Sequence, residues 1–360
     1  MLERSRCIND SVCCRTDVNT LKFLFVGDTG GLPIYPYVTY AQKKVAKALA
    51  KINYERKTEF LISTGDNIYY TGVDDDNDQR FESSFEDVYN SNKPWYFIAG
   101  NHDHFGNISA QVSYTSKSRR WTFPSLYYKI SYKFGANNNT LVEFLMIDTI
   151  VLCGNTRDIE SAGFLKMLFA DVFLDPNNPK NPAAAHAQLQ WIEQQLKQSK
   201  ADYLFVVGHY PVYSIASHGP SSCLIKKLKP LLERYNVTAY IAGHDHTLQH
   251  IIDKPEVKNQ TSSSIMHYIV TGAASRTDTS TKHKNDIPFS SLKFHYPKSF
   301  FNLFSQFGFS SGGFVYAALN SDHGLFQFYD GSGSQMYHFV LQPLTKELQV
   351  FSKANGSPFS

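Results

Sequence analysis

Five segments of the chain end an apolar, strand-like run with glycine and place a metal-competent side chain at or just beyond that glycine. The segments read LFVGDTG, LISTGDNIYY, FIAGNHD, FVVGHYP and YIAGHDH. Carboxylate, amide, phenol and imidazole groups can all donate an oxygen or nitrogen atom to a metal ion. The candidate ligands are Asp28, Asp66, Tyr69, Asn101, His209, His244 and His246.

This ligand set exceeds the four ligands of one tetrahedral zinc ion, and it suits two metal ions that share a carboxylate. Each residue alone has a plainer interpretation, because an Asp after a strand usually forms a turn and a lone His is usually structural. Tyr69 has the alternative of a core tyrosine, in which case both ions would be divalent. Five coincidences in one chain favour the metal site.

The elements that would position these residues alternate between strands and helices. The sequence predicts strands over 21–26, 59–64, 95–100, 203–209 and 237–246, and helices over 37–56, 80–90, 183–199 and 223–236. Such alternation indicates crossover units and parallel strands, whose carboxyl ends meet at one crevice.

The rest of the chain favours antiparallel pairing. A hairpin is expected from 125–135 and 141–148, and the C-terminal part contains several short strands joined by polar turns. We therefore expect an α/β fold, a four-layer α-β-β-α sandwich of two packed mixed sheets flanked by helices. It would form one domain over residues 20–350, preceded by an irregular segment over 1–19.

Composition excludes several classes of protein. The net charge of +3 is not gathered into long basic runs, so nucleic-acid binding is not expected. No run of 18 apolar residues is present, so no transmembrane segment is expected. The N-terminus has no apolar h-region, so no signal peptide is visible.

The motifs GDTG, GDNIY, GNHD, GHYP and GHDH, in this order, resemble the five-block pattern of the calcineurin-like metallophosphoesterases. Tyr69, three residues after Asp66, narrows the resemblance to the purple acid phosphatases. Longer strings such as GHYPVYSIASHGPSSCL are similar to the small, mammalian-type, tartrate-resistant members. The resemblance runs from about residue 20 to about residue 345. It implies an acid phosphatase that hydrolyses phosphate monoesters by attack of a metal-bound hydroxide.

The resemblance also implies a role for each ligand at a dinuclear Fe(III)–M(II) centre. The ferric ion would be held by Asp28, Tyr69 and His246. The divalent ion, which is Fe(II) in animal members and Zn or Mn elsewhere, would be held by Asn101, His209 and His244. Asp66 would bridge the two ions. Catalytic assistance to the phosphate or the leaving group would come from His102 and His218.

The donor chemistry agrees with a trivalent ion. A phenol has a pKa near 10, so only a strongly Lewis-acidic cation would keep Tyr69 ionised in acid. Hard Asp and Tyr oxygens suit Fe(III), whereas two imidazoles and an amide suit a borderline divalent ion. His218 has a plainer alternative, as a cap of the following segment. We expect Asp103 to support His102 rather than bind metal. His104 and Asp245 are expected to support other residues or to pack.

The resemblance implies further properties. The family disulfide would join Cys153 to Cys223, and a family glycosylation site would lie at Asn107. The family is secreted or lysosomal. The expected partner is a phosphate-ester substrate, a small molecule or a phosphoprotein, and the chain is expected to be a monomer.

Two alternatives and several departures from the family remain. The alternatives are an iron-binding or iron-transport protein with incidental phosphatase activity, and a divalent-metal phosphodiesterase in which Tyr69 does not ligate. The departures are the missing signal sequence, the three early cysteines (Cys7, Cys13 and Cys14) and the long segments 154–182 and 275–313. A short docked helix is expected over 161–174.

Overall fold

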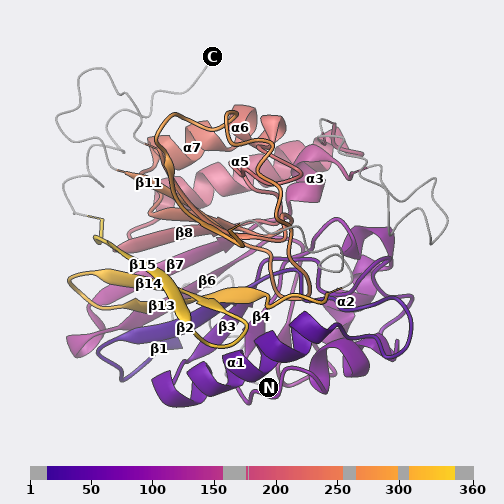
Figure 1. Ribbon diagram of the computed structural model, residues 1–360. Helices are drawn as coiled ribbons and strands as arrows, with labels where there is room; N and C mark the ends of the chain where they lie inside the picture. Colours follow the sequence, from indigo (N-terminus) through magenta and orange to yellow (C-terminus); the bar gives the residue numbers. More distant parts are fainter. Residues whose placement is uncertain (1–13, 157–175, 177, 254–264, 299–307, 345–360) are drawn as a thin grey trace.

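The computed structural model describes residues 14–156, 176, 178–253, 265–298 and 308–344, which form two packed β-sheets with helices on both outer faces (Figure 1). The predicted α/β sandwich of two mixed sheets is confirmed. The helix predicted over 161–174 lies outside the described residues.

The larger sheet has eight strands among the described residues, in the order β1-β6-β7-β8-β9-β11-β10-β12. From β7 to β11 neighbouring strands are parallel, and β6, β10 and β12 add antiparallel pairs. The strands are β1 (Cys14–Arg15), β6 (Tyr128–Phe134), β7 (Thr140–Met146), β8 (Tyr203–Val207), β9 (Ala239–Ala242), β10 (Leu248–Asp253), β11 (Met266–Thr271) and β12 (Leu292–Tyr296).

The smaller sheet has seven strands in the described part of the chain, in the order β15-β14-β13-β2-β3-β4-β5. Strands β2 to β5 are parallel, whereas β13, β14 and β15 are antiparallel. The strands are β2 (Leu21–Val26), β3 (Phe60–Ser63), β4 (Trp95–Tyr96), β5 (Trp121–Thr122), β13 (Gly313–Leu319), β14 (Gly324–Asp330) and β15 (Gln335–Leu341).

Helices cover the two outer faces. Figure 1 shows α5, α6 and α7 together on one side of the sheets and α1 on the other. The helices are α1 (Tyr40–Arg56), α2 (Ile108–Tyr114), α3 (Thr149–Cys153), α5 (Pro182–Gln198), α6 (Ser222–Lys227) and α7 (Lys229–Arg234). Shorter turns are a π-helical turn (Glu82–Glu86) and 3-10 turns (Asp103–Phe105 and Ala136–Asn138).

Aromatic side chains fill the space between the two sheets. Phe23 of β2 lies edge-on to Phe144 of β7 with ring centroids 5.2 Å apart. Phe205 of β8 and Phe326 of β14 meet across the same space at 5.9 Å. Burying such a ring stabilises the fold by about 1.5–3 kcal/mol. This core fixes the position of the two sheet edges relative to each other.

Two predicted helices differ from the structure for identifiable reasons. The helix expected over 223–236 is divided into α6 and α7, because Pro230 lacks the N–H that a continuous helix requires. The helix expected over 80–90 is only a π-helical turn. There the carbonyl oxygen of Ser84 accepts a hydrogen bond from Gln42 Nε2 at 2.8 Å instead of continuing a helix.

The observed strands also differ from the predicted ones in several places. The strand expected over 95–100 pairs only at Trp95–Tyr96, and the following residues lead into the Gly100 turn. Strand β12 lies within 275–313, where no strand is predicted. Cys14–Arg15 form a short strand inside the segment expected to be irregular. Strand β11, expected to be antiparallel, pairs antiparallel with β10 but parallel with β9.

Candidate metal centre

The five predicted segments converge at one edge of the molecule. Strands β2, β3 and β4 of the smaller sheet are mutually parallel, as are β8 and β9 of the larger sheet. Their carboxyl ends carry Asp28, Asp66 and Asn101 from one sheet and His209 and His244 from the other. The site is therefore shared between the two sheets.

The backbone at this edge adopts unusual conformations. Asp28, Asp66 and His244 have positive φ angles of 58°, 51° and 68°, in the left-handed region. Such a conformation costs about 1–3 kcal/mol per non-glycine residue and concentrates at functional sites. Gly65 has φ +94°, and a Cβ there would lie 2.6 Å from Nδ1 of His209. Glycine thus permits the close approach of the two sheets.

A first group of side chains meets at the Tyr69 hydroxyl. It donates a hydrogen bond to Oδ1 of Asp28 at 3.0 Å and lies 2.9 Å from Nε2 of His246. The same carboxylate oxygen lies 3.5 Å from Nε2 of His246. Three of the predicted ligands thus direct donor atoms to one point.

A second group meets at the Asn101 amide. Its Oδ1 lies 2.9 Å from Nε2 of His209 and 3.1 Å from Nδ1 of His244. Asp66, His209 and His244 offer ligand atoms that all lie within 4.8 Å of one another. Oδ1 of Asp66 is 3.4 Å from Nε2 of His209, so Asp66 lies beside this second group.

A contact between Asp28 and His244 connects the first and second groups. Oδ2 of Asp28 accepts a hydrogen bond from the backbone N–H of His244 at 3.0 Å. Oδ1 of Asp66 accepts from the backbone N–H of His102 at 3.0 Å. All seven predicted ligands are therefore brought into one site.

Backbone carbonyls orient two of the imidazoles. Nδ1 of His209 lies 2.9 Å from the carbonyl oxygen of Thr64, which leaves Nε2 free to face Asn101 and Asp66. Nδ1 of His102 lies 2.7 Å from the carbonyl oxygen of Tyr70. Its Nε2 then faces Oδ2 of Asp66 at 3.9 Å.

The two histidines with expected catalytic roles lie on the accessible side of the site. The His102 side chain is 18% exposed, and its ring centroid is 4.6 Å from that of Tyr69. The His218 side chain is 26% exposed, and its ring centroid is 4.1 Å from that of His244. His218 is held by Oδ1 of Asp245 at 2.9 Å from Nδ1.

The site concentrates buried negative charge. Asp28 and Asp66 are 0% and 1% exposed, and neither forms an ion pair with a Lys or Arg in the described part of the chain. Burial alone would raise the pKa of Asp66, but His209 and His102 lower it overall. Burial, with the nearby Asp28 and Asp66, raises the pKa of the Tyr69 phenol well above its usual value.

Three polar residues expected to have supporting roles are all anchored. Asp103 accepts from the backbone N–H groups of Asn67 and Gly100 rather than from the His102 side chain. Nε2 of His104 lies 2.7 Å from Oδ2 of Asp148. Asp245 holds His218, as described above.

Sequence reasoning missed three contributors to the site. Asn155 donates from Nδ2 to the carbonyl oxygen of Asn101 at 3.2 Å, and Thr156 accepts from Asn101 Nδ2 at 3.1 Å. Arg276 lies over the ring of Tyr69, with the guanidinium carbon 4.4 Å from the ring centroid. The available signal was the strand-like run IMHYIVTG, a sixth strand ending in glycine that precedes Arg276.

Comparison with known proteins agrees with this geometry. The sequence model described as calcineurin-like phosphoesterase matches residues 21–248. Rat tartrate-resistant acid phosphatase type 5 is 40% identical over 328 residues, covering 90% of this chain and 91% of the rat protein. The chain belongs to the purple acid phosphatases, within the calcineurin-like phosphoesterases. The human type 5 enzyme is 39% identical and covers 88% of this chain and 89% of its own length.

A plant relative also supports membership of the purple acid phosphatases, and this membership gives the enzyme class. Purple acid phosphatase 4 of Arabidopsis thaliana is 31% identical, covering 71% of this chain and 69% of the plant protein. The chain is accordingly an acid phosphatase, a phosphoric monoester hydrolase whose family implies a dinuclear metal centre. The comparisons give no support to the iron-carrier or phosphodiesterase alternatives.

Solved structures share the fold. The Plasmodium protein titled "GAP50 the anchor in the inner membrane complex" superposes with a TM-score of 0.69 at 23% identity, covering 93% of this chain and 94% of that chain. Purple acid phosphatase PPD1 from yellow lupin gives a TM-score of 0.62 at 13% identity, covering 96% of this chain and 57% of the lupin chain.

Among the described helices, none combines the length and hydrophobicity needed to cross a bilayer.

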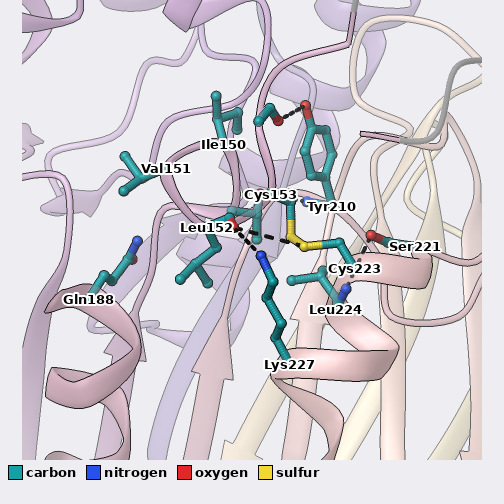
Figure 2. Close-up of a disulfide and its surroundings, with 12 residues drawn as sticks. Ile150, Val151, Leu152, Cys153, Gln188, Tyr210, Ser221, Cys223, Leu224 and Lys227 are labelled. Carbon is teal, nitrogen blue, oxygen red and sulfur yellow. Dashed lines mark hydrogen bonds between the residues drawn. A yellow bond between two sulfur atoms is a disulfide. The ribbon is translucent and has the colours of Figure 1, made fainter. Parts of the chain in front are cut away.

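The predicted disulfide is confirmed. Cys153 at the end of α3 is bonded to Cys223 in α6, as Figure 2 shows. In the same view Nζ of Lys227 donates to the carbonyl oxygen of Leu152 at 3.3 Å. The bond joins residues 70 positions apart and lies beside the segment that carries Asn155 and Thr156 to the metal centre.

Proposed function

We propose that this acid phosphatase acts at an Fe(III)–M(II) centre. Asp28, Tyr69 and His246 would hold the ferric ion. Asn101, His209 and His244 would hold a divalent ion, Fe(II), Zn or Mn. Asp66 would serve both. The observation that carries the proposal is the meeting of the buried Tyr69 hydroxyl with Asp28 and His246 at 3.0 and 2.9 Å.

The donor set fits two cations. Two buried carboxylates without a Lys or Arg ion pair in the described ranges leave negative charge to be balanced. Burial opposes ionisation of the Tyr69 phenol, so only a strongly charged cation would make it an anionic ligand. These two facts favour a trivalent ion beside Tyr69.

We assign the roles of stabilising charge on the substrate to two histidines of this chain. His102 and His218 lie on the accessible side, where a phosphate ester would enter, and we propose that they stabilise charge on the phosphate or the leaving group. The ions, when bound, supply Lewis acidity and activate water for attack in acid. Asp245 would keep His218 oriented toward the substrate.

We also propose a secreted or lysosomal location and a monomeric state. The Cys153–Cys223 disulfide supports an oxidising compartment. Asn107, the residue of the family glycosylation site, is exposed and therefore accessible to modification. Small phosphate esters and phosphoproteins are the proposed substrates.

The test is metal analysis combined with a visible absorption spectrum of the purified holoenzyme. We expect two metal ions per chain, at least one of them iron, and a purple or pink tyrosinate-to-iron band. Tyr69→Phe should abolish the band. The control is Tyr268→Phe, because the buried Tyr268 hydroxyl has no hydrogen-bond partner among the described residues and lies in β11. A colourless, manganese-loaded, active enzyme would contradict the ferric assignment.

A further inference from the structure

The loop after β11 contacts the candidate ferric site from a sixth strand end. The backbone N–H of Ser275 donates to the carbonyl oxygen of Asp28 at 3.1 Å. The backbone N–H of Asp278 donates to the carbonyl oxygen of His246 at 2.8 Å. Arg276 lies between these two anchors, so its backbone is fixed relative to two of the three candidate ferric ligands.

The Arg276 guanidinium is buried against tyrosine rings. The residue is 4% exposed, and its guanidinium carbon lies 4.4 Å from the ring centroid of Tyr69 and 4.8 Å from that of Tyr70. Nη1 donates to the Tyr70 hydroxyl, and Nη2 donates to the carbonyl oxygen of Gly31 at 3.2 Å. These contacts hold the planar group over the rings.

This cation has no carboxylate in direct contact among the described residues. In the described part of the chain Arg276 forms no ion pair with a carboxylate, and its buried Nε has no hydrogen-bond partner. A buried guanidinium is normally paired. Here its positive charge lies instead on the face of the ring whose hydroxyl meets Asp28 and His246.

We propose that Arg276 is a positioning residue that tunes Tyr69 as an iron ligand. This inference rests on the proposed ferric site. The guanidinium fixes the ring plane and, through its charge on the ring face, lowers the energy of the electrons that Tyr69 would donate to iron. A weaker donor favours the ferrous over the ferric state and moves the tyrosinate-to-iron band to shorter wavelength.

The effect is expected to be measurable because the contact is desolvated. A desolvated cation over an aromatic face is among the stronger contacts of this kind, and its loss should change an equilibrium by about 5-fold to 30-fold. Arginine is suited to this position because its planar group stacks on rings while its N–H groups donate hydrogen bonds in the plane of the group.

The test compares Arg276→Met with the wild-type holoenzyme. We expect the visible band of the Met variant at longer wavelength and, in a redox titration followed at that band, a ferric-to-ferrous ratio about 5-fold to 30-fold higher at fixed potential. Arg276→Lys keeps the charge without planar stacking, so its band should lie between the other two. Arg276→Gln also removes the charge and can still donate toward Tyr70, so it replaces the Met variant if that variant does not fold.

The control is Arg56→Met, because Arg56 lies over the ring of Tyr316, 5.8 Å from its centroid, outside the metal centre. That variant should leave the band and the ratio unchanged. A wild-type band and ratio in both neutral variants of Arg276 would overturn the inference while leaving the ferric site intact. A wild-type holoenzyme without a tyrosinate band would overturn both.

Discussion

At the scale of the residue, each candidate ligand is ordinary by itself and unusual only in its surroundings. Asp28 is fully buried, has a left-handed backbone and contacts Tyr69, His246 and the N–H of His244. A residue that only forms a turn does not need to be buried in this way. The combination of strain and unbalanced charge is what a metal ion would offset.

The catalytic role of His102 gives a prediction at this scale. His102→Ala should lower turnover of an aryl phosphate by about 100-fold or more, because a group that stabilises charge on the phosphate or the leaving group is lost. Metal content should stay at the wild-type value, since His102 belongs to neither ligand group and its backbone N–H still bonds Asp66. Steady-state kinetics with elemental analysis measure both quantities.

The matched control for His102 is His104→Gln. His104 is bound to Asp148 and not to the ligand groups, so turnover should change little. Unchanged turnover in His102→Ala would contradict a catalytic role for this histidine.

At the scale of the element, the ligand-bearing turns are held by cross-links between elements. Gln42 of α1 donates to the carbonyl oxygen of Thr29 at 2.7 Å, beside Asp28. Asp103 accepts from Gly100 N–H at 2.8 Å and from Gln111 Nε2 of α2 at 2.8 Å. These bonds fix the turns after β2 and β4 independently of any ion.

The Asp103 cross-link gives a stability prediction. Asp103→Ala should lower the free energy of unfolding by on the order of 3 kcal/mol, because several buried N–H donors lose their acceptor. Urea unfolding measures the change. Asp330→Ala is the control, since Asp330 accepts from Ser332 N–H at 2.9 Å in an exposed turn away from the site. That variant should lose only about 1 kcal/mol, and equal losses would contradict the anchoring role.

A histidine pair between β10 and β11 predicts acid sensitivity. Nε2 of His250 lies 3.0 Å from Nδ1 of His267, and burial lowers their pKa values to about 3 and about 4. Unfolded histidines titrate near 6.5, so the unfolded state binds more protons below that pH. Their contribution to stability is complete above about pH 6.5 and is lost progressively as the pH falls from there to the folded pKa values.

The double variant His250→Leu/His267→Leu should therefore lose less stability on acidification. Between pH 6.5 and about 4, each of the two histidines should lower the wild-type free energy of unfolding by about 1.4 kcal/mol per pH unit. The variant should not show this loss. Urea unfolding at pH 7 and pH 5 measures this slope. The exposed His323→Asn is the control, and parallel slopes in wild type and double variant would refute the prediction.

At the scale of the whole molecule, the site exists only where the two sheets meet. Asp28, Asp66, Tyr69 and Asn101 follow strands of one sheet, and His209, His244 and His246 follow strands of the other. The aromatic core that packs Phe23 against Phe144 therefore also sets the spacing between the two ligand groups.

The disulfide gives a prediction at this scale. Replacing Cys153 and Cys223 by serine should lower the free energy of unfolding by about 4 kcal/mol, because the bond closes a loop of 70 residues in the unfolded chain. The visible band should persist, since neither cysteine is a candidate ligand. Denaturant unfolding and the spectrum of the folded double variant test the two parts, and an unchanged unfolding free energy would contradict the first.

Much of the fold was predictable because local patterns and final structure agree. The apolar run before Asp28 is β2, and the run before His209 is β8. The division of the helix over 223–236 was also readable, since Pro230 stands in the sequence and its missing N–H acts locally. Strand β12 was not predictable in this way, because it forms only by pairing with the edge of β10.

By itself the sequence determined the chemical types of the ligands, their order and the glycines that let the chain turn beside them. The tertiary structure alone decided which ligands share a point, because Tyr69 and His246 meet across 177 positions of chain. It also decided the role of Arg276, whose contact with Tyr70 spans 206 positions. No local pattern encodes such a contact, since it depends on how two sheets pack rather than on how one segment folds.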